Sequence, residues 1–385
     1  MKTTTPRTKD PFGVHLGLIG TAFYALLTSP FWMGTALGLP VVHAWSSRMA
    51  LLGFLAALFV PPAVVWAKRR WRTAGILAAS SLVLVGAGWA LRSVDVPVPS
   101  HSGQVAAFSV EMGDGKVWGP WDVLPEMDWI RAGGAAGKIF DVTGDQSRYL
   151  LEETEKFETA MAADPDFAAL PSQIPRAIDG LLGLPQRSGH YVLLTATPQS
   201  PKRKGLVVFL HGSAANFRAY AWLLRDVVLK TGWDVIVPTY GFGDWNRPDG
   251  LAAIEAAVAS ARARAHYGTG GIVAAGVSNG GRGLTRLIAF GNVPLKSVVF
   301  ISPVMESTVM ETPGFKARAK GLPVTVVAGL KDDRIPAAYV EFARQLLVDE
   351  GAQVTAVPFP EGDHFILFSQ SGAILEEIEK AIIQP

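Results

Sequence analysis

Two patterns of hydrophobic residues divide this chain. The first 95 residues contain long runs that are almost wholly apolar, whereas from about residue 186 short apolar segments alternate with amphipathic ones. Residues 96–185 follow neither pattern. We therefore predict three parts: a membrane anchor at 1–95, a linker and possible cap segment at 96–185, and a folded domain at 186–385.

A membrane-spanning helix needs about 20 apolar residues, and runs in the first part approach this length. Residues 14–45 contain no acidic side chain and no lysine or arginine, and we expect one spanning helix over 14–37, kinked at Pro30. Residues 49–67 and 74–91 are the next two candidates. A cleaved signal peptide is the competing interpretation of the first run. It would be followed by polar mature sequence, whereas further apolar runs follow here.

Positive charge sets the expected orientation of the anchor. The segment 68–72, Lys-Arg-Arg-Trp-Arg, lies between the second and third runs, and short basic loops stay on the cytoplasmic side of a membrane. Three crossings place the N-terminus, with Lys2, Arg7 and Lys9, on this same side. We therefore expect a multi-pass membrane protein whose remaining chain lies on the outer, periplasmic side.

From residue 186 onward the apolar segments are short and rich in β-branched residues, which is typical of strands. Amphipathic stretches that predict helices separate most of them. Strands that are almost continuously apolar and alternate with helices indicate an α/β fold, with a mostly parallel sheet covered on both faces. The predicted strands are 190–197, 205–210, 233–238, 271–277, 297–302, 323–329 and 353–359, and the predicted helices are 217–230, 250–266, 282–290, 337–350 and 371–383.

The strand at 271–277 leads into the most informative turn of the chain. Gly276, Ser278 and Gly280 fit the pattern Gly-x-Ser-x-Gly, and an amphipathic helix follows. In a nucleophile elbow this pattern places a serine on a sharp strand-to-helix turn, where neighbouring side chains would clash. Ser278 is therefore the candidate nucleophile.

A serine nucleophile needs a base, and the base needs an acid that orients it. His364 follows the predicted strand 353–359, and Asp332 follows the strand 323–329. The chain order is thus Ser278, Asp332, His364. Asp333, the neighbour of Asp332, is the alternative acid, and Glu306, one strand earlier, is a more distant one.

In these motifs and their order, residues 186–385 resemble the α/β-hydrolase superfamily of serine esterases and lipases. The resemblance implies an α/β-hydrolase fold with Ser278, Asp332 and His364 as catalytic residues, and the apolar runs place about three transmembrane helices before it. It also implies an oxyanion hole made by two backbone N–H groups. Ser213, which follows His211-Gly212, would supply one of them, and Asn279 the other. His211 itself is expected to brace the turn.

The composition of the chain argues against several other kinds of site and function. The chain has no cysteine, which excludes disulfides, thiolate catalysis and cysteine-based zinc sites. Its formal net charge of +2 indicates no nucleic-acid partner. We expect neither a cofactor nor a metal. Polar groups are scarce in the apolar runs, which disfavours a transporter.

The function expected from the sequence is a membrane-anchored serine hydrolase that cleaves a small-molecule or lipid-like acyl ester or thioester. A peptidase or amidase on the same fold is one alternative. The other is a non-catalytic, membrane-bound binding protein with a hydrolase-like domain.

The segment 101–185 is the least clear part of the sequence. Helices are predicted at 145–163 and 175–182, and Trp118, Trp121 and Trp129 are costly to leave in water. We therefore expect part of this segment to fold onto the core near the mouth of the Ser278 pocket, as a cap. A disordered linker is the alternative, because residues 133–137 are rich in glycine.

Overall fold

The structure is a computed structural model of the chain. It describes Tyr24, Thr28 and residues 35–66, 71–95, 108–112, 124–132, 144–168, 170, 190–196, 202–213, 217–267 and 271–384. The described residues form two compact units. One comprises Met1–Pro97 with Pro120–Glu152, and the other comprises Val98–Gly119 with Glu153–Pro385.

The second unit is built on an eight-stranded sheet with the order β1-β2-β5-β4-β7-β8-β9-β10. Strands β5, β4, β7, β8, β9 and β10 run parallel to one another, and β2 is antiparallel to both β1 and β5. This topology fits the α/β fold expected from the sequence. The strands are β1 (Phe108–Met112), β2 (Tyr191–Ala196), β4 (Leu206–Leu210), β5 (Asp234–Pro238), β7 (Ile272–Val277), β8 (Leu295–Ile301), β9 (Pro323–Gly329) and β10 (Gln353–Phe359). A separate parallel pair joins β3 (Lys202–Arg203) to β6 (His266–Tyr267).

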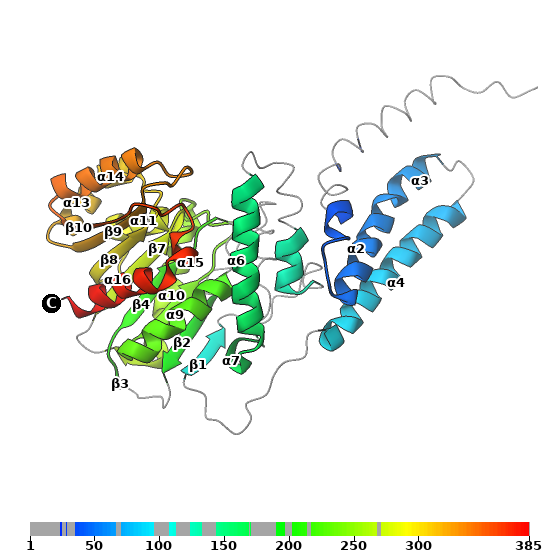
Figure 1. The fold of residues 1–385 in the computed structure, drawn as a ribbon, viewed down its shortest axis with the longest axis horizontal. Coiled ribbons are helices and arrows are strands. Elements are labelled where there is room, and N and C mark those ends of the chain that lie inside the picture. Colours follow the sequence, from blue (N-terminus) through cyan, green and yellow to red (C-terminus); the bar gives the residue numbers. More distant parts are fainter. Residues whose placement is uncertain are drawn as a thin grey trace, which may run out of the picture. The chain divides into compact units, whose positions relative to one another are not determined.

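Helices cover both faces of this sheet (Figure 1). Side chains of successive strand residues point to opposite faces, so Leu206, Val208 and Leu210 join one core cluster while Val207 and Phe209 join the other. The first cluster is closed by α10 (Pro248–Arg264), α11 (Gly280–Phe290), α13 (Pro313–Ala319) and α14 (Ala337–Asp349). The second is closed by α6 (Gly144–Ala162), α7 (Pro165–Ala168), α9 (Phe217–Thr231), α15 (Ile366–Ser369) and α16 (Ser371–Ile383).

Every strand and helix predicted between residues 186 and 385 is confirmed, with small shifts at the ends. The strands β9 and β10 and the helix α16 have the predicted bounds. The sequence did not predict β1, because its pairing partner β2 lies about 80 residues away in the chain. Pairing of this kind is not encoded in the local apolar pattern.

Part of the segment 101–185 packs onto the second unit. The helix predicted at 145–163 is present as α6, and Met161, Phe167 and Leu170 are buried in the second core cluster. The helix predicted at 175–182 lies outside the described residues. The described residues from Glu153 to Leu170 are thus docked, and do not form a free linker.

The first unit contains a pair of long helices, with α2 (Trp45–Leu58) against α4 (Trp71–Asp95), and the shorter α3 (Val60–Trp66). Their backbones approach closely at glycines: a Cβ on Gly88 would lie 2.6 Å from the Ser46 carbonyl oxygen. The Ser81 hydroxyl donates to the Gly53 carbonyl across the same contact, at 2.8 Å. Small and polar groups therefore fill the interface between these helices.

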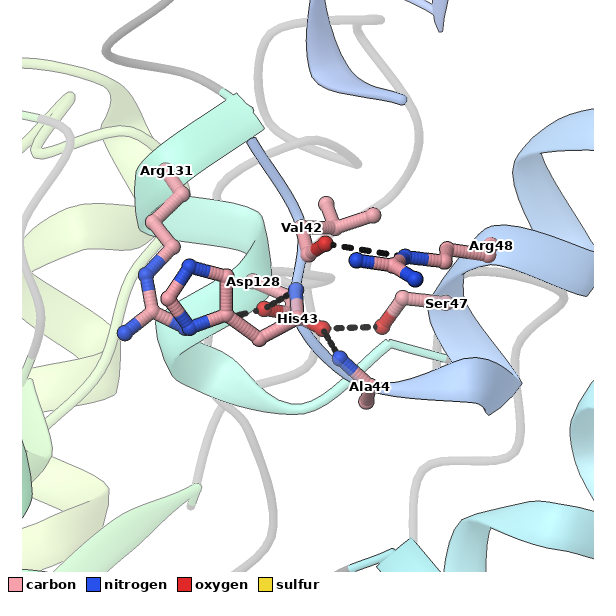
Figure 2. Close-up of polar contacts among 7 residues, drawn as sticks. All are labelled: Val42, His43, Ala44, Ser47, Arg48, Asp128 and Arg131. Carbon is pink, nitrogen blue, oxygen red and sulfur yellow. Dashed lines mark hydrogen bonds and ion pairs between the residues drawn. The ribbon is translucent and has the colours of Figure 1, made fainter. Parts of the chain in front are cut away.

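The buried carboxylate of Asp128, in the short helical segment 126–132, forms hydrogen bonds with the start of α2 (Figure 2). Asp128 accepts hydrogen bonds from the backbone N–H groups of His43 and Ala44, each at 3.0 Å, and from the Ser47 hydroxyl. Arg131 forms an ion pair with the same carboxylate at 3.1 Å. Helices leave N–H groups without partners at their first turn and favour negative charge there. Asp128 thus caps α2 from more than 80 residues away in the sequence.

The expectation of about three transmembrane helices is corrected in the described part of the chain. Two segments there are long and apolar enough to cross a membrane, Trp45–Val64 and Arg72–Leu91. They correspond to the second and third predicted runs. Most of the first run, 14–37, lies outside the described residues. Trp118 and Trp121 also lie outside them, whereas Trp129 packs in the first unit against a cluster containing Val42 and Leu51.

Candidate active site

Ser278 occupies a strained turn between β7 and α11. Its φ of 52° lies in the left-handed region, which is unfavourable for any residue with a side chain. Both backbone polar groups of Ser278 are held by the end of β8 and the residues that follow it. Its N–H donates to the Ile301 carbonyl at 3.0 Å, and its carbonyl accepts the Val304 N–H at 2.9 Å. Such strain persists only where the surrounding structure fixes it, and it is common at functional sites.

Two glycines let the neighbouring backbone approach this turn. A Cβ on Gly280 would lie 2.3 Å from the Leu210 carbonyl oxygen, at the end of β4. A Cβ on Gly212 would lie 3.1 Å from the Cβ of Ser278. At Gly280 the requirement for glycine in the motif is therefore steric, as the sequence predicts for the elbow.

The structure brings together the residues predicted as nucleophile, base and acid. The Nε2 atom of His364 lies 3.0 Å from Ser278 Oγ, and its Nδ1 atom lies 2.8 Å from Asp332 Oδ2. The Asp332 side chain is 1% exposed and the His364 side chain 10%. With Nδ1 protonated and donating to Asp332, Nε2 is free to accept the proton of Ser278.

The alternative acids are placed differently. The second oxygen of Asp332 accepts the backbone N–H groups of Arg334 and Ile335, at 3.0 and 2.8 Å. The carboxylate is thus fixed on one side by the loop and on the other by His364. Asp333 is exposed, and Glu306 pairs with Arg286 at 2.8 Å. Of the carboxylates considered from the sequence, Asp332 is the one within hydrogen-bond distance of His364.

The turn predicted to carry the oxyanion donors lies against the elbow. The side-chain amide of Asn279 donates to the Ser213 hydroxyl at 2.6 Å, which joins the residues whose backbone N–H groups were predicted to form the oxyanion hole. Asn279 immediately precedes α11, so its N–H belongs to the group of unpaired donors at a helix start. The role of these N–H groups as an oxyanion hole stays a prediction.

His211 is buried behind this turn and is fully hydrogen-bonded. Its Nδ1 atom lies 2.7 Å from the Gly212 carbonyl, and its Nε2 atom accepts the Tyr240 N–H at 3.1 Å. Burial lowers the pKa of His211 from 6.5 to about 4, against a smaller opposing effect of the hydrogen bond to Gly212. His211 is therefore neutral near pH 7 and braces the turn, as expected from the sequence.

The sequence did not predict a second support of this turn. The Nε1 atom of Trp245 donates to the His211 carbonyl at 2.9 Å, and the two rings lie 4.9 Å apart. Trp245 is fully buried. It belongs to the loop after β5, and its indole N–H was the available signal, because buried tryptophans usually find an acceptor.

Among the described residues, no group of three or more histidine, aspartate or glutamate side chains could hold a metal ion. The arrangement of Ser278, His364 and Asp332 can act without one. It places a hydroxyl, an imidazole and a buried carboxylate in a single row of hydrogen bonds.

Comparisons with known proteins show similarity to solved esterase structures. No protein-family model matches the sequence, and no curated protein matches it. A butyrate-bound esterase from Thermogutta terrifontis is 15% identical, with a TM-score of 0.41, over 50% of this chain and 88% of the other. A fungal esterase from Rhizomucor miehei is 14% identical, with a TM-score of 0.41, over 50% and 79%. Esterase PE8 is 22% identical, with a TM-score of 0.38, over 48% and 97%. Similarity at this level assigns no activity.

Proposed function

We propose that this protein is a membrane-anchored serine hydrolase that cleaves an ester or thioester by acyl transfer. The observation that carries the proposal is the continuous row of hydrogen bonds from Ser278 through His364 to Asp332, with distances of 3.0 and 2.8 Å. The strained backbone of Ser278, directly after the central parallel strand β7, is further support for the proposal.

In this mechanism Ser278 Oγ attacks the acyl carbonyl carbon while His364 Nε2 accepts the hydroxyl proton. Asp332 keeps the proton of His364 on Nδ1 and stabilises the imidazolium that forms. The imidazolium then returns its proton to the leaving alcohol or thiol, and the C–O or C–S bond breaks. Water, deprotonated by His364, attacks the acyl-enzyme and releases the carboxylic acid and free Ser278.

The developing oxyanion would be stabilised by the backbone N–H groups of Ser213 and Asn279. The Asn279–Ser213 side-chain hydrogen bond keeps these residues in a fixed relation before substrate binds. Loss of one such donor costs about 3 kcal/mol of transition-state stabilisation. The neutral, fully hydrogen-bonded His211 and the buried Trp245 hold the turn from behind.

Membrane anchoring is supported by the inverted polarity of the first unit. Its helix interface contains glycine and serine, whereas large apolar side chains point outward, with Leu82 75% and Val83 68% exposed. Helices that pack through small residues and present apolar surfaces outward suit a lipid environment. We place the basic segment 68–72 on the cytoplasmic side and the catalytic unit on the outer side.

Labelling with a fluorophosphonate tests this function in the detergent-solubilised full chain. We expect wild-type protein to be labelled and to hydrolyse p-nitrophenyl esters, and Ser278→Ala and His364→Ala to lose both properties while keeping the wild-type circular dichroism spectrum. A series of p-nitrophenyl esters from acetate to palmitate then defines the acyl chain length. Labelling or ester turnover by Ser278→Ala at the wild-type rate would contradict the assignment.

The same assay separates the other functions considered. Turnover of p-nitroanilides in preference to esters would indicate an amidase or peptidase. A folded wild-type protein that is neither labelled nor active on any of these substrates would instead be a binding protein.

A further inference from the structure

The segment that holds the proposed catalytic base is short. His364 lies between β10 and α15, which has a single turn. Ile366 and Leu367 are buried in the second core cluster, and Phe368 is half-buried at its edge. The contacts of Phe368 therefore contribute to the position of His364, four residues earlier in the chain.

Phe368 packs against aromatic rings from two other helices. Its ring lies 5.5 Å from that of Tyr220 on α9 and 5.6 Å from that of Phe157 on α6. Phe157 also contacts Trp222 of α9, with ring centroids 5.8 Å apart in an edge-on arrangement. Tyr220 in turn lies 5.4 Å from Phe209 on β4, the strand that leads to the oxyanion turn. These separations are those of favourable aromatic pairs.

A second contact of α6 reaches the helix that follows the oxyanion turn. Glu158, the neighbour of Phe157, forms an ion pair with Arg218 on α9, at 3.8 Å, and both side chains are at least nine-tenths buried. Arg218 is five residues after Ser213. Adjacent residues of α6 thus contact Phe368, which follows the proposed base, and the helix that follows one proposed oxyanion donor.

We propose that Phe157 is a positioning residue for His364: α6 acts through Phe368 to hold the imidazole at hydrogen-bond distance from Ser278. This inference rests on the proposed function. It gives α6, which lies within the segment 101–185, a role in positioning the proposed catalytic histidine.

The proposal rests on the sensitivity of the reaction rate to the position of the base. A shift of about 1 Å in a reacting group can lower a rate about 100-fold, and the 3.0 Å contact between His364 and Ser278 allows little movement. If the Phe157 ring is removed, Phe368 loses one of the two aromatic neighbours that it has among the described residues. A positioning role predicts that the effect falls on kcat rather than on KM.

Steady-state kinetics of the full chain in detergent test this directly. The test variant is Phe157→Leu, which removes the ring but keeps most of the apolar volume. We expect kcat for p-nitrophenyl butyrate to fall at least about tenfold, with KM within about twofold of wild type. The rate of fluorophosphonate labelling should fall in parallel, and Phe157→Tyr, which keeps the ring, should restore kcat to near the wild-type value.

Met161→Ala is the matched control. Met161 is on the same helix, one turn after Phe157, and is fully buried in the same core cluster. It should lower the melting temperature at least as much as Phe157→Leu while leaving kcat within about twofold of wild type, because a cavity near Met161 removes no ring from Phe368.

The possible outcomes are distinct. A kcat of Phe157→Leu within about twofold of wild type overturns the proposal, and so does an equal loss of kcat in Met161→Ala, which would show general destabilisation. Either result leaves the proposed function intact, since the wild type would still be active. Absence of labelling and turnover in the wild type would instead contradict the proposed function itself.

Discussion

The Nδ1 atom of His364 lies 2.8 Å from the Asp332 carboxylate, whose other oxygen is held by two backbone N–H groups. The neighbouring Asp333 is exposed. We expect Asp332→Asn to lower kcat on the order of 1,000-fold or more, because an amide donor at this position favours the wrong tautomer of His364. Asp333→Asn should stay within about twofold of wild type. Initial rates on a p-nitrophenyl ester, measured at equal concentrations of folded protein, compare the two variants. A larger loss of kcat in Asp333→Asn than in Asp332→Asn would show that Asp333 is the acid.

A second prediction concerns stability at acid pH. His211 has a pKa of about 4 in the folded protein, lowered from 6.5 mainly by burial. Between these values the unfolded chain binds a proton that the folded protein does not. The contribution of His211 to the free energy of unfolding is therefore fully present above pH 6.5 and is lost as pH falls toward 4. The effect is of the order of 3 kcal/mol. Melting temperatures between pH 4 and pH 8 should therefore fall less steeply for His211→Gln than for wild type.

The amide of His211→Gln supplies a donor and an acceptor but does not titrate, which makes it the suitable variant. Subtracting its melting curve from that of the wild type removes the contribution of other acidic groups. Identical pH dependences in the two proteins would show that His211 does not titrate as the structure indicates.

A third prediction concerns the cap of α2. Asp128→Ala leaves the His43 and Ala44 N–H groups and the Ser47 hydroxyl without their acceptor (Figure 2). Losing a helix cap costs about 1 kcal/mol and each buried unsatisfied donor about 1–3 kcal/mol, so the first unit should be destabilised by several kcal/mol. Arg131→Gln removes the partly exposed ion-pair partner but leaves the carboxylate in place, and it should cost less than about 1 kcal/mol.

Thermal unfolding in detergent, followed by tryptophan fluorescence, measures this difference. The residues of the proposed catalytic site lie in the second unit, so kcat of Asp128→Ala at a temperature well below its transition should equal that of the wild type. Equal melting temperatures for Asp128→Ala and wild type would show that this carboxylate does not stabilise the helix.

A fourth prediction concerns membrane topology. Alkaline phosphatase folds only outside the cytoplasm, and green fluorescent protein exported in unfolded form stays dark. In a Gram-negative host, a C-terminal phosphatase fusion should therefore be active and a C-terminal fluorescent fusion dark. Fusions made directly after Arg72, at the basic segment 68–72, should give the reverse pattern. A bright fluorescent fusion at the C-terminus would place the catalytic unit in the cytoplasm and overturn the expected orientation.

The local apolar pattern determined most elements of the second unit. Strands such as 323–329 and 353–359 were predicted to the residue, because each is a short apolar run bounded by polar or turn-forming residues. Ser278, Asp332 and His364 were found for a related reason: each follows a predicted strand of a parallel sheet, and the carboxyl ends of such strands meet at one edge. Sequence pattern and chain order were sufficient to select these residues as candidates.

The tertiary structure decided the contacts between segments that are far apart in the chain. No residue near Asp128 in the sequence indicated that it caps α2, and none near residue 108 indicated that this segment pairs with β2. The sequence showed Phe157 only as an apolar residue of an amphipathic helix, without its ring contacts. The choice between Asp332 and Asp333 also depended on the side-chain direction that the folded loop imposes. Periodicity is a property of neighbouring residues, whereas the partner of a buried carboxylate or an edge strand depends on the path of the whole chain.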